Sequence, residues 1–149
     1  DMSETMAQAN GIGIAAPQIG EMVQVAIVGI EKENPRYEQE VEFAEEIIIN
    51  PKVEYLAKDL SGNWEGCLSV PGLRGFVERP SEVCVKYFDI NGVKKEIQSD
   101  DFVAIVLQHE LDHLFGKLYV DRISDITQLV YEDEMPRDEE EDFDEDFED

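Results

Sequence analysis

The segment from Phe102 to Leu118 constrains the fold most, because it is the one stretch whose apolar pattern predicts a complete helix. Asp100 or Asp101 is suited to cap its first turn, and Gly116 lies near its end. The rest of the chain must therefore provide surfaces against which a single long apolar helix can be buried.

Both histidines of the chain lie in this helix, in the sequence His109-Glu110-Leu111-Asp112-His113. Residues four apart share one face of a helix, so His109 and His113 are placed to bind the same metal ion. Glu110 lies one step round and is placed to act as general base toward a water on that metal. The pattern predicts a metal site.

A catalytic metal site of this kind has a third protein ligand and an open position. Glu132 and Glu134 lie downstream, as in an endopeptidase with two histidine ligands, but they border an acidic segment. Cys67 lies upstream, and a cysteine there is equally suited to packing in a core, as we expect for Cys84. The residues alone leave the third ligand open. Two cysteines are also too few for a scaffold built on disulfides.

Short apolar runs upstream of the helix predict strands over Met22–Ile30, Ile47–Ile49, Val53–Leu56, Val83–Ile90 and Val93–Ile97. Asn91-Gly92 predicts a hairpin with a type I′ turn between the last two. We interpret Glu31–Glu46 as a surface loop, and Met2, Met6 and Ala9 as the end of a helix that stops at Asn10-Gly11. The predicted fold class is α+β, with short, mainly antiparallel strands packed around one central helix.

The charge is concentrated at the C-terminal end. The formal net charge is −24, and residues 132–149 contain 13 acids and one base. We predict a domain over residues 1–128 and an acidic, disordered tail over 129–149, in which Phe143 and Phe147 could dock on a partner. The negative field argues against DNA and anionic lipid as partners. No apolar run is long enough to cross a membrane, and no secretion signal is visible.

A glycine- and alanine-rich segment, Gly11–Gln18, permits close approach of the backbone, and Pro17 blocks a helix there. It lacks the third glycine of a dinucleotide-binding motif. Gln18 is either a surface amide or an oriented hydrogen-bond donor.

Three segments together, Gly11–Gln18, Glu65–Ser69 and Gln108–His113, resemble the three signature motifs of the peptide deformylase family, in the same order. The resemblance extends from about residue 1 to Ile123. It implies an α+β fold around the His-Glu-x-x-His helix. It also implies a hydrolase of protein biosynthesis that removes formate co-translationally from the N-terminal methionine of newly made polypeptides.

The resemblance also implies the roles of individual residues. The metal ligands would be Cys67, His109 and His113. A hydroxide formed at the metal would attack the formyl carbon, with Glu110 as general base and acid. The side-chain amide of Gln18 and the backbone N–H of Leu68 would stabilise the oxyanion. One divalent ion is implied, Fe²⁺ in the cell, with Zn²⁺, Ni²⁺ or Co²⁺ able to replace it; the ligand set does not choose between iron and zinc.

By the same resemblance, the substrate would add as an extended strand beside Ile12, Gly13, Val70 and Gly72. The methionine pocket would be lined by Ile12, Phe102, Ile105, Val106 and His109, although a core face has the same spacing. Arg79 would bind the peptide backbone.

Two departures from the family pattern are visible. From the resemblance we would expect a strand and the start of a helix before residue 1 of this sequence, and the C-terminal end is acidic where a basic or amphipathic helix is usual. Ribosomal RNA would repel that end, so ribosome contact is disfavoured. We expect a monomer in the cytoplasm of a bacterium or a phage-infected cell, or in an organelle. The alternatives are an endopeptidase with a glutamate from residues 132–149 as ligand, and a non-catalytic relative whose tail recruits a basic partner.

Overall fold

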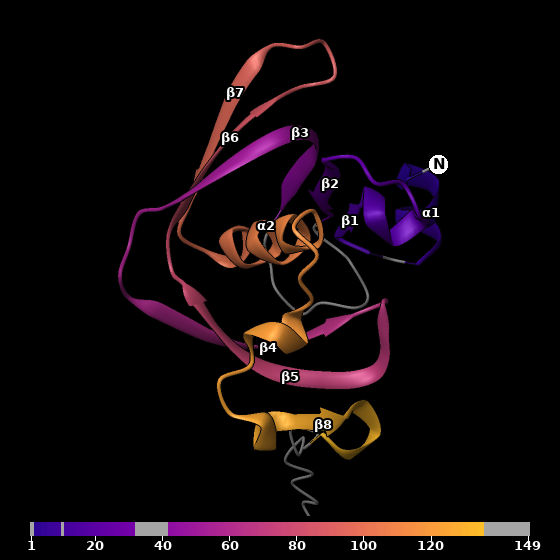
Figure 1. Cartoon of the computed structure of the whole chain (residues 1–149), viewed down its shortest axis with the longest axis vertical. Coiled ribbons are helices and arrows are strands. Elements are labelled where there is room, and N and C mark those ends of the chain that lie inside the picture. The colour runs from indigo at the N-terminus through magenta and orange to yellow at the C-terminus, as the bar shows by residue number, and fades with distance from the viewer. Residues whose placement is uncertain (1, 10, 32–41, 136–149) are drawn as a thin grey trace, which may run out of the picture.

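A computed structural model describes residues 2–9, 11–31 and 42–135, and its strands form two antiparallel sheets (Figure 1). The five-stranded sheet has the order β1-β2-β3-β6-β7, and the three-stranded sheet has the order β4-β5-β8. The larger sheet comprises β1 (Gly13–Ala15), β2 (Val25–Ile30), β3 (Phe43–Tyr55), β6 (Val83–Phe88) and β7 (Lys94–Ser99). The smaller sheet comprises β4 (Leu60–Cys67), β5 (Val70–Pro80) and β8 (Leu129–Tyr131). The predicted α+β class is confirmed.

Within the described residues, two α-helices accompany the sheets, α1 (Met2–Gln8) and α2 (Phe102–His113). Short 3₁₀ turns lie at Ala16–Ile19, Tyr119–Arg122, Ile126–Gln128 and Glu132–Glu134. Figure 1 shows α2 in the middle of the molecule, with the larger sheet on one side and β4 and β5 on the other. The central position predicted for this helix is therefore confirmed.

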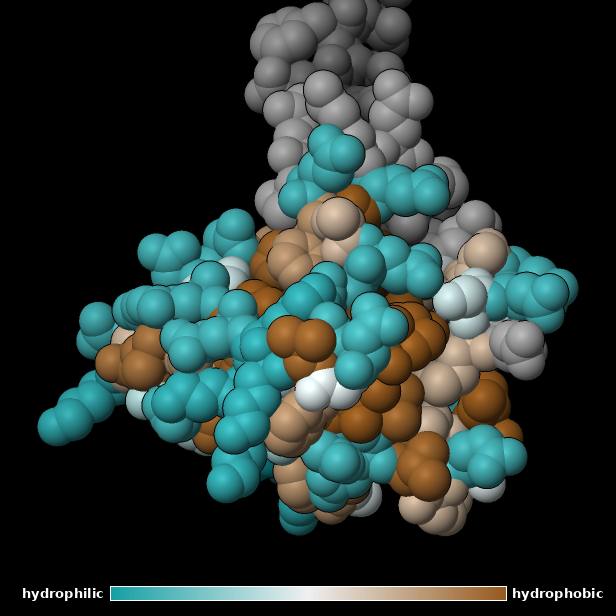
Figure 2. All heavy atoms as spheres, turned by 90° about the horizontal axis from the view of Figure 1, so that it is seen from above, coloured by the Kyte–Doolittle hydropathy of each residue, from teal (hydrophilic) through white to brown (hydrophobic). Residues whose placement is uncertain are grey.

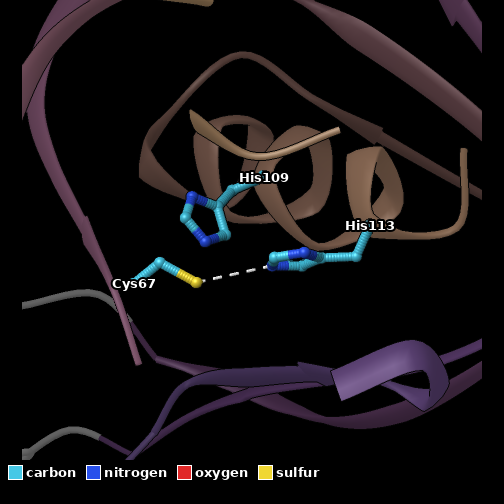
Figure 3. A group of neighbouring side chains, drawn as sticks. All are labelled: Cys67, His109 and His113. Carbon is cyan, nitrogen blue, oxygen red and sulfur yellow. Dashed lines mark hydrogen bonds between the residues drawn. The ribbon is translucent and has the colours of Figure 1, made fainter. Parts of the chain in front are cut away.

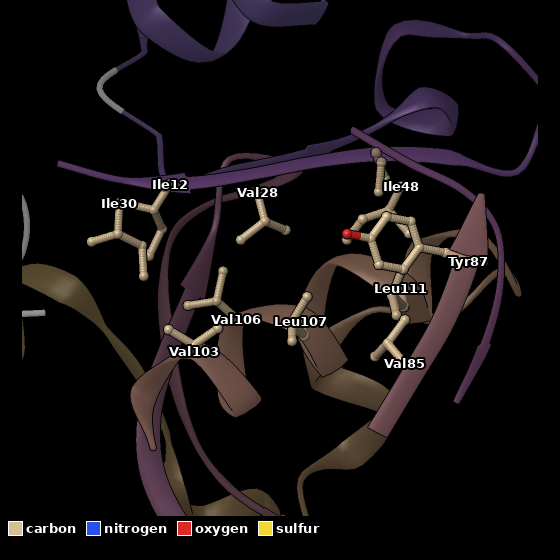
Figure 4. Close-up of a cluster of buried hydrophobic side chains, with 12 residues drawn as sticks. Ile12, Val28, Ile30, Ile48, Val85, Tyr87, Val103, Val106, Leu107 and Leu111 are labelled. Carbon is tan, nitrogen blue, oxygen red and sulfur yellow. The ribbon is translucent and has the colours of Figure 1, made fainter. Parts of the chain in front are cut away.

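The main core lies between α2 and the larger sheet. Val103, Leu107 and Leu111 of the helix face Val28, Ile48 and Val85 of the strands, as Figure 4 shows. Leu107 and Ile48 are completely buried. Burial of such side chains is worth about 1.5–3 kcal/mol each, so this cluster fixes the helix against the sheet.

The ends of α2 follow from local hydrogen bonds. Asp101 caps the start, since its carboxylate accepts a hydrogen bond from the Val103 N–H at 2.9 Å. The helix ends at His113, earlier than the predicted Leu118, because Gly116 adopts a left-handed φ of 73°. This glycine stops the helix as a Schellman motif, in which the Lys117 N–H donates back to Asp112 O at 2.9 Å.

The hairpin of β6 and β7 is confirmed, but the type I′ turn is wrong. That turn needs positive φ at both Asn91 and Gly92, and only Gly92 has it, at 76°. The Asp89 carboxylate accepts hydrogen bonds from the N–H groups of Asn91 and Val93, both at 2.9 Å. These bonds favour a three-residue turn that begins one position earlier than Asn91.

Strand β3 is longer than predicted. Ile47–Ile49 and Val53–Tyr55 belong to one strand, which also takes in Phe43–Glu46 from the predicted loop. Asn50 joins the two halves with a φ of 48°, and the pairing with β6 shifts register there. Because of this local bulge, the apolar pattern does not indicate that the two halves form one strand.

The first and the last described segments both pack against these sheets. Met6 of α1 is buried against Ile14 and Ile27, as its helical spacing predicted, whereas Asn10 lies outside the described residues. Leu129–Tyr131 pairs with β5, so the ordered structure continues past residue 128. The predicted tail beyond Met135 lies outside the described residues.

Within the described ranges, no helix has the length and apolarity needed to cross a membrane. Hydrophilic side chains cover much of the face in Figure 2 and leave several apolar areas between them.

Candidate metal centre

The end of β4 and one face of α2 bring Cys67, His109 and His113 together (Figure 3). The Cys67 Sγ lies 3.6 Å from His113 Nε2, and one ligand atom from each residue lies within 4.8 Å of the others. A thiolate and two imidazoles at this spacing are suited to one ion of iron or zinc type. Of the candidates that the sequence left open for the third ligand, Cys67 is the one that lies beside both histidines in the described residues.

The electrostatics of the cluster favour a cation. Burial raises the pKa of Cys67, but hydrogen bonds to His109 and His113 outweigh burial and lower it from 9.0 to about 5. Burial lowers the pKa of His109, but Cys67 and Glu65 outweigh it and raise that pKa to about 10. An anionic thiolate beside a carboxylate is the environment that a divalent ion would neutralise.

His109 is held in orientation by Glu65, which the sequence did not single out as a site residue. The His109 Nδ1 lies 2.8 Å from Glu65 Oε1. Arg79 donates two hydrogen bonds to Glu65, at 2.7 and 2.9 Å. A carboxylate on Nδ1 leaves Nε2 directed at a metal, as in many histidine sites.

The predicted site residue Arg79 lies in a buried network of ion pairs. It is only 4% exposed, and its third contact is a 2.9 Å ion pair with Asp112, next to the ligand His113. Arg122 completes the network with bonds of 3.0 and 3.2 Å to the same carboxylate. The hydrogen bonds of this guanidinium to two buried carboxylates indicate that Arg79 holds Glu65 and Asp112 in place, and its predicted contact with a peptide backbone stays a prediction.

Glu110 is buried beside the ligands, and its Oε2 has no hydrogen-bond partner among the described residues. Burial raises its pKa from 4.5 to about 7, although His109 and His113 oppose the shift. A Cβ at Gly13 would come within 2.4 Å of the Glu110 side chain. Only glycine at that position lets β1 pass so close to this carboxylate.

Gln18 is an oriented amide. Its Oε1 accepts a hydrogen bond from the Ala15 N–H at 2.9 Å. Its Nε2 faces Ser69 Oγ at 3.1 Å and Cys67 Sγ at 3.7 Å. The reading as a surface amide is therefore disfavoured, and the donor points toward the cluster.

A cavity of about 270 Å³ opens beside the cluster. Its lining includes most of the predicted site residues, namely Ile12, Gly13, Gln18, Cys67, Leu68, Phe102, Ile105, Val106, His109 and Glu110. Val70 and Gly72 are not among the lining residues, and Gly72 lies at a turn with a φ of 78°. The predicted strand-like contact with these two residues stays a prediction.

Several residues of the site carried no signal in the sequence. Asn63, Trp64 and Arg74 line the cavity, and they come from β4 and β5, which the apolar pattern did not predict. The Tyr119 ring stacks on His109, with centroids 6.2 Å apart and planes 16° apart. Nothing in the local sequence connects Tyr119 with a histidine ten residues earlier; the stacking arises from the return of the chain after α2.

A helix with paired histidines, a cysteine ligand from a second element and a buried glutamate without a partner defines a metal-dependent hydrolase. Comparison with known proteins gives the family. A family model described as polypeptide deformylase matches residues 1–129. The peptide deformylase of Leptospira biflexa is 47% identical over 135 residues, which cover 91% of this chain and 75% of the relative.

Solved structures agree with this match. The class I type b peptide deformylase from Acinetobacter baumannii, bound to Met-Ala-Ser, is 43% identical with a TM-score of 0.77, covering 82% of this chain and 76% of that one. A probable peptide deformylase from Synechococcus phage S-SSM7 is 36% identical with a TM-score of 0.71, covering 82% and 78%. The chain belongs to the peptide deformylase family, whose activity is the metal-dependent removal of the formyl group from peptides.

Proposed function

We propose that this chain removes the formyl group from the N-terminal methionine of newly made polypeptides, and that Glu110 moves the protons. The observation that carries this proposal is the convergence of Cys67, His109 and His113 beside the unpartnered Glu110. The convergence joins two segments that are more than forty residues apart in sequence.

Cys67, His109 and His113 would hold one divalent ion, and the buried acid without a partner fits a site that such an ion completes. Bound there, the ion would lower the pKa of a water and polarise the formyl oxygen. We propose Fe²⁺ in the cell, with Zn²⁺, Ni²⁺ or Co²⁺ as substitutes. The mixed sulfur and nitrogen donor set supports iron or zinc over magnesium or calcium.

Glu110 would accept the proton of the attacking water and deliver it to the departing amine. Its pKa of about 7 supports both steps, since an acid–base group works best near the ambient pH. Its burial keeps bulk water away from the proton in transit.

Gln18 Nε2 and the Leu68 N–H would stabilise charge on the formyl oxygen. The hydrogen bond from Ala15 fixes the amide of Gln18 before the substrate arrives, which supports this role. Leu68 follows the ligand Cys67 and lines the same cavity.

The methionine side chain would enter the apolar part of the cavity. Phe102, Ile105 and Val106 line it, and Phe102 and Ile105 are only partly buried, which favours a pocket over a closed core. Strand β1 is an edge strand, so the backbone near Gly13 is placed to pair with an extended peptide.

The test is formate release from formyl-Met-Ala-Ser, a substrate chosen because Met-Ala-Ser is bound in the Acinetobacter structure. Anaerobically purified, metal-loaded protein should turn it over, and Glu110→Gln should retain metal and lose about 10²–10⁴-fold in rate. A folded, metal-loaded wild type without turnover would refute the proposal and favour the non-catalytic alternative.

The endopeptidase alternative finds no support in the geometry. Glu132 lies 3.1 Å from Arg74 in an ion pair, and it is not part of the ligand cluster. Removal of residues 136–149 together with Glu132→Gln and Glu134→Gln should leave the metal content unchanged. We further propose a monomer in a bacterial or phage-infected cytoplasm, with no ribosome contact through the acidic end.

A further inference from the structure

The basic side chains of this acidic chain are segregated. Nine lysines and arginines lie in the described residues, and six of them line two grooves that share Lys52. These six, which we call the basic strip, are Lys52, Lys86, Lys94, Lys95, Lys117 and Arg122. The grooves have volumes of about 470 and 580 Å³. The strip therefore carries positive groups on a chain whose formal net charge is −24.

Half of the basic strip is not neutralised. Lys86 pairs with Glu54, Lys95 with Glu46, and Arg122 with Asp112, the last a buried group of the metal-site network. The three remaining cations are Lys52, Lys94 and Lys117. They are exposed, and none has a carboxylate within 4.0 Å in the described part of the chain.

The larger groove also has an aromatic character. Tyr55 of β3 and Phe115 after α2 line it, and each is 57% exposed. Exposed rings beside unpaired ammonium groups favour an occupant that has carboxylates and aromatic rings together. None of the basic strip lines the cavity of the metal site.

A segment with that chemistry follows the described residues. Residues 136–149 contain ten acids, one base, and the two aromatic residues Phe143 and Phe147. Fourteen residues span up to about 46–50 Å when extended, whereas a domain of this size has a radius of gyration of about 15 Å. The segment is therefore long enough to reach the strip from Met135, and tethering gives it a millimolar effective concentration.

We propose that the acidic segment 136–149 binds the basic strip of its own chain, with carboxylates on Lys52, Lys94 and Lys117 and a phenylalanine ring against Tyr55 and Phe115. RNA is the other polyanion that a lysine strip attracts. It is disfavoured because the acidic surface around the strip repels phosphates and the tethered carboxylates compete for the same lysines.

The test is carbodiimide coupling, which joins lysines to carboxylates in direct ion pairs, followed by peptide mapping of the full chain. At low salt, Lys52 and Lys117 should couple to residues 138–149 at least about tenfold more than the exposed Lys58, with a yield that does not change on dilution. In 1 M salt, where the Debye length falls to about 3 Å, the coupling should disappear.

Matched variants separate the strip from general charge effects. The double variant Lys52→Gln and Lys117→Gln should lose the coupling, and Lys58→Gln should retain it. Phe143→Ser with Phe147→Ser should lower the yield several-fold if the rings contribute. All should hydrolyse formyl-Met-Ala-Ser like the wild type, and circular dichroism checks that each is folded.

Three results would overturn the proposal. Lys58 could couple as often as Lys52 and Lys117, which means that the segment has no docking site. The links could form only between chains in proportion to concentration, which assigns the strip to a second copy. Finally, oligouridylate could bind the full chain with an affinity that the double lysine variant loses, which assigns the strip to RNA.

Discussion

The two sheets of this protein are built on different principles. The five-stranded sheet packs apolar side chains such as Val28 and Ile48 against α2, and its interior resembles any globular core. The three-stranded sheet buries the charged residues Glu65 and Arg79 instead. The comparison indicates that the larger sheet provides stability, and that the smaller sheet provides the geometry of the metal site.

Close approach by glycine replaces apolar bulk in the smaller sheet. A Cβ at Gly62 would come within 2.4 Å of the Phe76 ring, and one at Gly75 within 2.4 Å of Ile123. The Phe76 ring in turn meets Trp64 edge-on, with centroids 5.6 Å apart. In this sheet, the close packing at glycines and the ion pairs of Arg79 therefore hold Cys67 near α2.

The two cysteines give the largest contrast between the sheets. Cys67→Ala should abolish metal binding and lower deformylation by on the order of 10³-fold or more, because the ion contributes several kcal/mol to the transition state. Metal analysis and formate release measure both. Cys84→Ala, in β6 of the larger sheet, is the matched control and should keep metal and rate. If Cys67→Ala still bound metal and hydrolysed the substrate, the smaller sheet would not contribute a ligand to the metal site.

Arg79→Met tests whether buried charge holds the smaller sheet. The variant leaves Glu65 and Asp112 without this cation and should cost about 3–5 kcal/mol in free energy of unfolding. Loss of the support for His109 should also weaken metal binding about 10–100-fold. Urea unfolding and chelator competition are the measurements. Lys86→Met removes an exposed pair of the larger sheet and should leave the free energy of unfolding nearly unchanged, because solvent screens such a pair. Equal effects of the two changes would contradict the comparison.

Leu107→Ala tests the opposite half of the comparison. Deleting this fully buried side chain should lower the free energy of unfolding by about 2–5 kcal/mol. Metal content and rate per folded molecule should stay unchanged, since Leu107 faces away from the cluster. If metal affinity fell together with the free energy of unfolding, the roles that we assign to the two sheets could not be separated.

Glu110 lies between the sheets and makes stability depend on pH in the metal-free protein. Its pKa is raised on folding from 4.5 to about 7, so its favourable contribution is complete below pH 4.5 and is lost as the pH rises through 7. Glu110→Gln should therefore gain up to roughly 3 kcal/mol over metal-free wild type between pH 5 and pH 8. Urea unfolding at the two pH values tests this, and a difference that did not change with pH would mean that the acid is not desolvated.

Much of the larger sheet could be predicted because its signals are local. The alternation in β2, the hairpin of β6 and β7, and the cap and stop of α2 each depend on a few adjacent residues. The wrong predictions in this sheet also had local causes. Hydrogen bonds to the Asp89 carboxylate place the turn one residue earlier, and the irregular backbone at Asn50 interrupts the apolar pattern of β3.

The smaller sheet could not be predicted in this way. The sequence of β4, Leu60–Cys67, has few apolar residues and two glycines, so neither period nor propensity indicates a strand. The contact of Arg79 with both Glu65 and Asp112 crosses three elements, and no spacing along the chain encodes it.

The sequence by itself determined the helix that presents His109 and His113 on one face, because residues four apart in a helix must share that face. It also determined the acidity of the C-terminal end. Only the tertiary structure decided that Cys67 lies within 4.8 Å of the ligand atoms of His109 and His113, that Arg79 pairs with Glu65 and Asp112, and that six of the nine described basic side chains line two adjoining grooves. Those relations join residues distant in sequence, and their distances exist only after the sheets have packed against α2.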